Sequence, residues 1–493
     1  MEHRRARRGG QWKRWLYLTH RWLGIVTCLF FAVWFVSGLV MIYVPFPSLT
    51  RAERLTGLGP IDWRQVRVQP DARGARSMAL EMQAARPVWR IDWWDGPQTV
   101  VAATDGSEAG RTDAGEARVI AASFGRAPVV ALELVMRDQW TVAGSYERHR
   151  PLWKASLAGP GGRVLYVSSR TGAVVLDTGG RERFWNWLGS VPHWIYPTML
   201  RQDNEVWRQV VMWVSGPCIV GAVAGMWIGI LRLRTGSRRF SRGRMTPYRG
   251  WMGWHHWAGL IGGVFLIAWI FSGWLSVDPF RLFASKGIGQ ADERSYDSGG
   301  LPHIDLDRLA RHAQGARRVE VIHAAGRALI LIQRARTSDV VIDATTLDPA
   351  RLDRRLLVAA ARRLLPGAAI GRVELLRSPD AYWYEVDDLP VLPVLRVRFR
   401  DAAGTWVHID PATGELLGDM DRRRRIYRWA FDLLHKWDLN VLTSNRPGWD
   451  VVLWLLSLAG MITSVTGIRI GWSRLRPNRR PGSGDRGAPR SGR

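Results

Sequence analysis

The chain has 493 residues, of which 47% are apolar and 23% charged, and its formal net charge is +27. This composition excludes a disordered or low-complexity protein. With only two cysteines, Cys28 and Cys218, the chain has neither a disulfide framework nor an iron–sulfur cluster held by four thiolates. Trp is the commonest aromatic residue, with 28 against 13 Phe and 10 Tyr. Since Trp favours sites with one apolar and one wet side, the composition indicates a membrane interface.

Four long apolar segments along the chain predict four transmembrane helices. They lie at residues 16–44, 207–231, 251–277 and 449–472. Each exceeds the roughly 20 residues that cross the hydrocarbon core of a bilayer, and charged residues occur only near their ends. The first segment is longer than the core of a signal peptide and lacks a small-residue cleavage site, so we expect an anchor that is not removed.

Positive charge is concentrated in three short segments beside these spans. Residues 1–15, 232–250 and 473–493 together hold 20 Lys and Arg against two acids. Short basic flanks stay in the cytoplasm, so we expect both termini inside and the segments 45–206 and 278–448 outside. In a Gram-negative bacterium this predicts a multi-pass inner-membrane protein with two periplasmic domains. Because the charge lies beside apolar runs, we expect membrane lipid and not nucleic acid as its partner.

The two outer segments have the pattern of folded α+β domains. Alternating runs such as Arg163–Val167 and Leu395–Arg400 predict strands. Amphipathic patterns predict helices near residues 117–136 and 352–366. The tail 473–493 is rich in Pro, Gly and Arg and is expected to be disordered. The predicted fold class is a four-transmembrane-helix bundle with two α+β extracytoplasmic domains.

Residues that recur at fixed offsets predict two tandem repeats. The segment His20–Gly24 recurs as His255–Gly259, an offset of 235. The same offset relates Trp34, Ser37 and Gly38 to Trp269, Ser272 and Gly273. An offset of 242 relates Trp187, His193, Trp207, Ser215 and Gly225 to Trp429, His435, Trp449, Ser457 and Gly467. We therefore expect two copies of helix, outer domain and helix that run in the same direction.

Four of the eleven histidines occupy these repeated positions. We call His20 and His255, near the expected cytoplasmic ends of the first and third spans, the inner pair. We call His193 and His435, 14 residues before the second and fourth spans, the outer pair. Ionisable residues in or near spans suggest function, and imidazole is a common axial ligand of haem iron. A glycine one turn after each inner histidine lets a flat macrocycle approach the backbone. The pattern predicts two haem groups, each between two histidines.

The glycines in question are Gly24 and Gly259. A simpler interpretation stays open, because interfacial histidines are often only anchors and small residues in spans often only pack helices. His256 competes with His255 as a ligand, but the repeat aligns His255 with His20. His256 points about 100° away around the helix and suits a haem propionate or a quinol. We expect both cysteines in the core. We expect the remaining outer histidines to be ordinary surface residues: His149, His303, His312, His323 and His408.

Several short motifs resemble one known family. They comprise His20, Trp22, Gly24, Ser37 and Gly38 of the first span, their copy in the third span, and the phrase Asp410–Gly414 after a predicted strand. In these motifs and their order, residues 12–475 resemble the PepSY-associated transmembrane helix family, also called iron-regulated membrane proteins. The first outer segment departs from the pattern, since Ser168 stands where the second has Asp410.

The resemblance implies a four-span inner-membrane protein with PepSY-like outer domains, similar to haem b reductases of ferric siderophores. Carried over by motif, the haem ligands would be His20 with His255 and His193 with His435. The substrate would be a ferric siderophore or another ferric chelate, whose iron is released on reduction.

The chain has no Gly-rich dinucleotide fingerprint after a strand. We therefore expect its electrons to come from quinol or from a cytoplasmic reductase. Two other functions stay open. One is an anchored module whose PepSY domains bind peptides or restrain a peptidase. The other is a permease for iron chelates, which the scarcity of polar residues in the spans disfavours.

Overall fold

The computed structural model describes residues 2–384 and 390–476, with side chains from residue 11 onward. The chain divides into two compact units. We call the described parts of residues 1–35, 213–271 and 452–493 the helical unit. We call the described parts of residues 36–212 and 272–451 the sheet unit.

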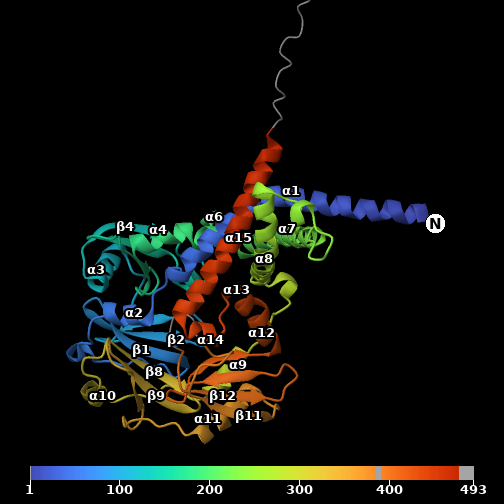
Figure 1. Cartoon of the computed structure of the whole chain (residues 1–493). Coiled ribbons are helices and arrows are strands. Elements are labelled where there is room, and N and C mark those ends of the chain that lie inside the picture. The colour runs from blue at the N-terminus through green and yellow to red at the C-terminus, as the bar shows by residue number, and fades with distance from the viewer. Residues whose placement is uncertain (1, 385–389, 477–493) are drawn as a thin grey trace, which may run out of the picture. The chain divides into compact units, whose positions relative to one another are not determined.

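Four long helices carry the predicted spans: α1 (Glu2–Tyr43), α7 (Asn204–Leu231), α8 (Gly250–Leu275) and α15 (Arg446–Leu475) (Figure 1). Each contains a helical stretch of 26 to 33 residues, which is long and apolar enough to cross a membrane. The ends of α7, α8 and α15 lie within three residues of those predicted, whereas α1 begins 14 residues before the predicted start at position 16. The four helices are therefore confirmed. The predicted disordered tail lies outside the described residues from position 477, whereas its first residues continue α15.

Small residues bring the helices of the helical unit close together. A Cβ added at Gly262 of α8 would lie 3.1 Å from a side chain of α15, and one at Gly221 of α7 would lie 3.1 Å from a side chain of α1. Such close approach is typical of helices packed in lipid. Both cysteines are buried, as expected. Apolar side chains such as Val26 and Ile261 remain largely exposed, which suits contact with lipid tails.

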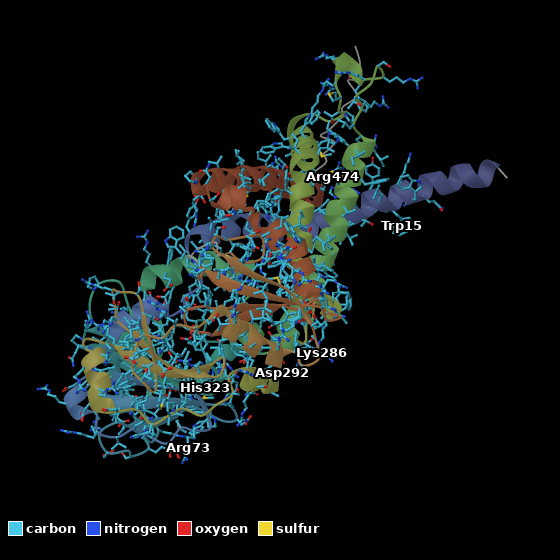
Figure 2. All side chains as sticks on the ribbon, turned by 90° about the horizontal axis from the view of Figure 1, so that it is seen from below. Trp15, Arg73, Lys286, Asp292, His323 and Arg474 are labelled. Carbon is cyan, nitrogen blue, oxygen red and sulfur yellow. The ribbon has the colours of Figure 1, made fainter. Side chains whose placement is uncertain are left out.

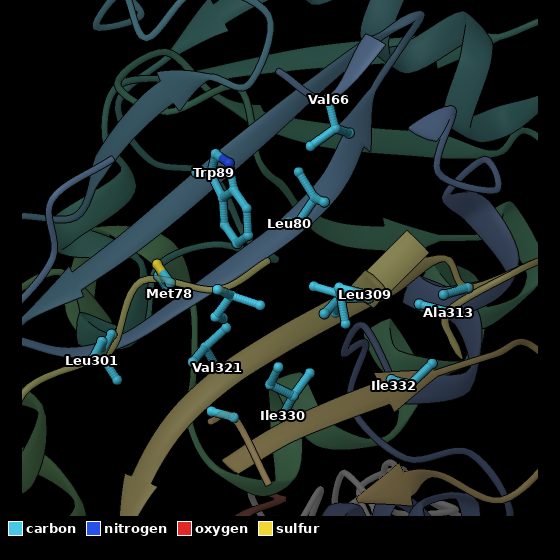
Figure 3. Close-up of a cluster of buried hydrophobic side chains, with 14 of the residues drawn as sticks. Val66, Met78, Leu80, Trp89, Leu301, Leu309, Ala313, Val321, Ile330 and Ile332 are labelled. Carbon is cyan, nitrogen blue, oxygen red and sulfur yellow. The ribbon is translucent and has the colours of Figure 1, made fainter. Parts of the chain in front are cut away.

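The sheet unit is built around an antiparallel sheet of six strands in the order β10-β9-β8-β1-β2-β3. The strands are β1 (Ala75–Gln83), β2 (Arg86–Trp93), β3 (Thr99–Ala102), β8 (Arg318–Ala324), β9 (Arg327–Gln333) and β10 (Val340–Asp343). One face packs on α10 (Leu306–His312), where Trp89, Leu80 and Val321 of the sheet gather with Leu309 (Figure 3). This is the largest buried cluster among the described residues.

This sheet corrects the prediction of two separate outer domains at 45–206 and 278–448. Strand β1 comes from the first segment and β8 from the second, and they pair directly, with Met78 opposite Val321. The alternating pattern predicts that a segment forms strands, but the partner of an edge strand is not encoded locally. The two segments therefore share one hydrophobic core.

Two further antiparallel sheets of four strands complete the sheet unit, and each is a simple meander. The first comprises β4 (Val129–Val135), β5 (Leu152–Leu157), β6 (Val164–Ser168) and β7 (Val174–Thr178), which pack on α3 (Ala114–Gly125). The second comprises β11 (Ile370–Leu376), β12 (Val394–Phe399), β13 (Trp406–Ile409) and β14 (Leu416–Met420), which pack on α11 (Arg354–Ala361). The fold is thus α+β, as predicted for the outer part.

The predicted helix at 117–136 is only half correct. Helix α3 begins with a capping box between Asp113 and Glu116 and ends at Arg126, whose φ of 54° is left-handed. Pro128 follows, and proline disfavours the helical conformation of the residue that precedes it. The β-branched Val129 and Val130 then open β4. The helix predicted at 352–366 is confirmed as α11 and the turn that follows it.

Short helices connect these elements. They are α2 (Arg51–Gly57), η1 (Trp63–Gln65), η2 (Gly144–His149), α4 (Gly180–Leu188), α5 (Ser190–His193), α6 (Thr198–Arg201), η3 (Ser241–Gly243), η4 (Pro279–Arg281), α9 (Gln290–Tyr296), η5 (Arg362–Leu364), α12 (Arg422–Tyr427), η6 (Arg428–Leu433), α13 (Leu434–Lys436) and α14 (Asn440–Thr443). Of these, α5 and α13 end at or contain the outer pair of histidines.

Candidate functional site: two pairs of facing histidines

The inner pair meets inside the helical unit. His20 of α1 and His255 of α8 face each other with ring centroids 6.2 Å apart and ring planes tilted by 34°. Both line a cavity of about 490 Å³ to which α1, α7, α8 and α15 all contribute. This volume lies in the range of about 300–1,000 Å³ that small-molecule and cofactor sites occupy. The cavity is mostly apolar apart from the histidines, two arginines and a few hydroxyl groups.

Backbone carbonyl groups fix which nitrogen of each inner histidine carries the proton. Nδ1 of His20 lies 3.0 Å from the carbonyl oxygen of Gly221 on α7. Nδ1 of His255 lies 3.1 Å from the carbonyl oxygen of Thr463 on α15. Since a carbonyl only accepts, each Nδ1–H donates and Nε2 of the neutral ring keeps its lone pair. This is the usual arrangement of a histidine that binds metal through Nε2.

Glycines provide the room that the inner rings occupy. The ring of His20 fills the space that a Cβ at Gly225 of α7 would take, and Cε1 of His255 would lie 3.4 Å from a Cβ at Gly467 of α15. The predicted glycines, Gly24 and Gly259, line the cavity wall instead. A Cβ at Gly24 would meet nothing within 4 Å. Gly225 and Gly467 recur as a pair in the sequence, but their recurrence does not indicate that they lie against the histidines.

His256 lies on the same cavity but does not face His20. Its Nε2 is 3.0 Å from the carbonyl oxygen of Gly229 on α7, and its ring packs edge-on against Tyr248 at 5.3 Å. The side chain is buried. His256 therefore joins α8 to α7, and the structure brings His255 rather than His256 to His20.

The outer pair meets inside the sheet unit with similar spacing. His193 of α5 and His435 of α13 have ring centroids 6.0 Å apart, with planes at 71°. Here the partners of Nδ1 are hydroxyl groups: Ser37 Oγ for His193 and Ser272 Oγ for His435, each at 3.0 Å. Both serines are buried. They recur at one offset in the sequence, but their contact with histidines more than 150 residues away is visible only in the fold.

Tryptophans at the starts of two spans hold the turns that carry the outer histidines. The indole N–H of Trp207 donates to the carbonyl oxygen of Trp194, the residue after His193, at 3.0 Å. The indole N–H of Trp449 donates to the carbonyl oxygen of Lys436, the residue after His435, also at 3.0 Å. These bonds explain why Trp recurs at these two positions. The accepting residues, Trp194 and Lys436, can differ, because the bond needs only their backbone carbonyl oxygen.

Additional contacts stiffen the turn around His435. A π-helix, η6, precedes it, and the ring of Phe431 stacks on His435 with centroids 5.2 Å apart. The buried pair Arg428 and Asp438 lies 2.9 Å apart, and the hydroxyl of Tyr384 donates to Asp438 at 2.6 Å. Burial, together with this bond, raises the pKa of Tyr384 above its usual range. π-Helical turns are frequent at functional sites.

Three of the five outer histidines correct the expectation of ordinary surface residues. His408 is buried, accepts a hydrogen bond from Arg396 at 2.8 Å and stacks on Trp383 at 4.5 Å. His149 and His323 line a polar cavity of about 450 Å³ in the sheet unit (His323 is marked in Figure 2). Only His303 and His312 are exposed. The burial of a single histidine cannot be predicted when no periodic pattern surrounds it.

That polar cavity also holds an unusual carboxyl group. Asp297 lies on its wall, close to Arg76 and Glu293. Burial raises the pKa of Asp297 to about 7, although Arg76 opposes the shift. Burial likewise raises the pKa of the nearby Glu415. The cavity therefore contains one carboxyl group, that of Asp297, whose pKa lies close to neutral pH.

Both histidine pairs have the spacing expected of two imidazoles that share one metal centre. Imidazole nitrogen binds a transition metal at about 2 Å, so an ion held between two imidazoles separates their centroids by roughly 6 Å. The observed spacings are 6.2 and 6.0 Å. Within residues 2–384 and 390–476, no group of three or more His, Cys, Asp or Glu side chains is placed to hold a metal ion. Two imidazoles suffice for haem iron, because the porphyrin supplies its other ligands.

Four helices of membrane-spanning length together with antiparallel sheets define a membrane protein with α+β domains. The sequence pattern of one family, the PepSY-associated TM region, matches residues 19–329, which is more than half of the chain. The chain therefore belongs to the PepSY-associated transmembrane family, and the resemblance noted in the sequence is confirmed. The match includes three of the four paired histidines and ends before His435. Among curated proteins, none matches the chain.

Proposed function

We propose that this protein is an inner-membrane electron-transfer protein with two haem b groups, which reduces ferric siderophores or other ferric chelates outside the membrane. The observation that carries the proposal is the presence of two imidazole pairs with the same spacing of about 6 Å. Membership of the PepSY-associated family agrees with it. In each turnover a donor, quinol or a cytoplasmic reductase, loses one electron and one Fe(III) of the chelate becomes Fe(II). Ferrous iron binds siderophore oxygen ligands more weakly and is released.

The residues of the chain have three tasks in this mechanism. His20 with His255, and His193 with His435, would hold the two haems through Nε2. Haem supplies one-electron transfer at iron when it is bound. The hydrogen bonds at Nδ1 orient the rings before binding, so that little conformational freedom would be lost when the cofactor enters. With two histidines as ligands, a haem at either site would serve electron transfer and not oxygen chemistry.

The apolar walls of the inner cavity keep water away from the inner site. Its apolar members include Phe31, Leu260 and Leu266. Arg21 and Arg474 line the same cavity and offer positive charge to acidic groups of the cofactor. A dry, apolar surrounding and fixed ligands are the main means by which a protein adjusts a haem.

The orientation proposed for this activity follows from charge. The excess of Lys and Arg in residues 1–15, 232–250 and 473–493 supports a cytoplasmic position for both termini and the short loop. The inner pair would then take electrons on the cytoplasmic side, and the outer pair would meet the chelate in the periplasm. Reporter fusions at Arg239 should read cytoplasmic, and fusions at Gly110 should read periplasmic. A periplasmic reading at Arg239 would reverse the direction of transfer.

A visible spectrum of the purified protein tests the proposal. We expect a reduced b-type spectrum and two haems per chain. His20→Ala and His255→Ala should each remove the same haem, and His193→Ala and His435→Ala the other, while the exposed His303→Ala serves as a control and keeps both. A colourless protein, or one whose haem content does not respond to these substitutions, rules the proposal out. A colourless protein that binds peptides would instead support an anchored peptide-binding module.

A further inference from the structure

The two histidine pairs differ in the group that accepts their Nδ1 hydrogen bonds. The inner pair is bonded to backbone carbonyl oxygens, at 3.0 Å for His20 and 3.1 Å for His255. The outer pair is bonded to serine hydroxyl groups, both at 3.0 Å. Both inner histidines thus have a backbone carbonyl oxygen at Nδ1, and both outer histidines have a serine hydroxyl there. Each serine also lies beside a glycine that makes room for the ring, Gly38 for His193 and Gly273 for His435.

At the inner pair the acceptors are strong and fixed. A peptide carbonyl cannot donate, so Nδ1–H must point to it. His255 has a second acceptor, because Thr466 Oγ1 lies 3.0 Å from Nδ1 while its own proton is directed to backbone carbonyl oxygens of α15. Donation from Nδ1–H to a good acceptor makes the imidazole a more basic ligand. A more basic ligand stabilises ferric over ferrous iron and lowers the reduction potential.

At the outer pair the acceptor is weaker. A hydroxyl oxygen is a weaker hydrogen-bond acceptor than a peptide carbonyl oxygen, whose acceptor strength is raised by amide resonance, so it polarises Nδ1–H less. The outer imidazoles are therefore less basic ligands than the inner ones. The chain thus contains two imidazole pairs of different basicity, and the difference comes from their hydrogen-bond partners.

We infer that Ser37 and Ser272 are positioning residues that set the reduction potential of the outer haem above that of the inner haem, so that electrons pass outward. The inference rests on the proposed function, since it concerns the haems that the two pairs would hold. It adds a direction of electron transfer that is built into the chain and does not depend on the donor or on the chelate.

The test is a redox titration of the purified, full-length holoprotein, followed by its visible spectrum. We expect two one-electron couples, and His193→Ala should remove the one of higher potential. Ser37→Ala and Ser272→Ala remove an acceptor and should each raise that couple alone. A change in a hydrogen-bond partner of a metal ligand typically has an effect on the order of tenfold. Tenfold in the reduction equilibrium corresponds to about 59 mV for one electron.

Matched variants separate this role from a merely structural one. Ser276→Ala is the control, because Ser276 lies one turn beyond Ser272 and its hydroxyl donates to a backbone carbonyl; it should move neither couple. Ser37→Thr keeps the hydroxyl and should restore the original potential. Thr466→Val removes one acceptor from His255 and should raise the lower couple alone.

Three results would overturn the inference: the higher potential belongs to the inner pair, the serine variants leave the upper couple in place, or they move both couples equally. If Ser37→Ala fails to hold haem, Ser37→Cys supplies a weaker acceptor of similar size, and its couple must then lie above that of the parent protein. A parent protein without haem refutes the proposed function itself, which distinguishes the two failures.

Discussion

Gly225→Ala tests most directly whether the inner cavity holds a cofactor between His20 and His255. The methyl group would occupy the place of the His20 ring, with Nδ1 only 2.7 Å and Nε2 3.2 Å from the new Cβ. Ordinary contacts to a Cβ lie at 3.4–4 Å, so the ring must move away from α7. That movement strains the hydrogen bond of Nδ1 to Gly221 and misdirects Nε2.

The magnitude follows from the size of the overlap. Inserting one methyl group into a well-packed site costs about 1–3 kcal/mol. At about 1.4 kcal/mol for each factor of ten, the affinity for haem at the inner site should fall by roughly 5- to 150-fold. The substitution does not destabilise helix α7 itself, since the helix propensity of Ala exceeds that of Gly by up to about 1 kcal/mol.

Haem per chain, measured as the pyridine complex across a dilution series, gives the result. The expected outcome is loss of one haem at low concentration while the other stays. Gly467→Ala should have a smaller effect, because its Cβ would lie 3.4 Å from His255. Gly24→Ala, which meets nothing within 4 Å, is the neutral control. Two intact haems in Gly225→Ala, with an unchanged spectrum, would falsify the placement of His20 as a ligand.

Three further outcomes are expected. His255→Ala should empty the inner site, whereas His256→Ala should keep its haem and mainly lower stability; the opposite pattern in haem content refutes the choice of ligand. Glu81 is buried, which alone would raise its pKa, but Arg90 and Arg318 lower the pKa to about 2. The carboxylate of Glu81 therefore stabilises the fold above about pH 4.5, and this stabilisation is lost as pH falls towards 2. Glu81→Gln should destabilise the sheet unit by about 3–5 kcal/mol, measured by urea unfolding at pH 7. Since the pKa of Asp297 is raised to about 7, its contribution to stability is present below about pH 4 and is lost as pH rises through 7; Asp297→Asn should remove this loss, and equal pH profiles for variant and parent would contradict it.

The membrane helices were predictable because their signal is local and long. A run of more than 20 apolar residues identifies a candidate span without knowledge of its neighbours, and three of the four observed helices end within three residues of the predicted limits, while α1 extends further towards the N-terminus. The β4 strand was missed because an apolar run of seven residues fits either a helix or a strand. The junction of β1 with β8 was missed because strand pairing joins residues about 240 positions apart.

The sequence likewise predicted part of the candidate site, namely the residues that take part but not their contacts. Recurrence at fixed offsets was enough to select the four histidines that face each other in pairs. It also selected Ser37 and Ser272, but not their role, because a hydrogen bond needs an acceptor at about 3 Å and the offset says nothing about distance. The carbonyl partners Gly221 and Thr463 left no signal at all, since any residue provides a carbonyl.

The seam between β1 and β8 makes the two halves of the chain dependent on each other. A chain that ended before residue 278 would leave the edge of β1 unpaired, with the fully buried Met78 and Leu80 deprived of their neighbours in β8. Unpaired edges with apolar faces recruit other strands. A half-length chain is therefore expected to associate through this edge, for example with the β1 strands of two copies side by side. The full chain makes that association intramolecular and fixes a ratio of one to one between the two halves, whatever its level of synthesis.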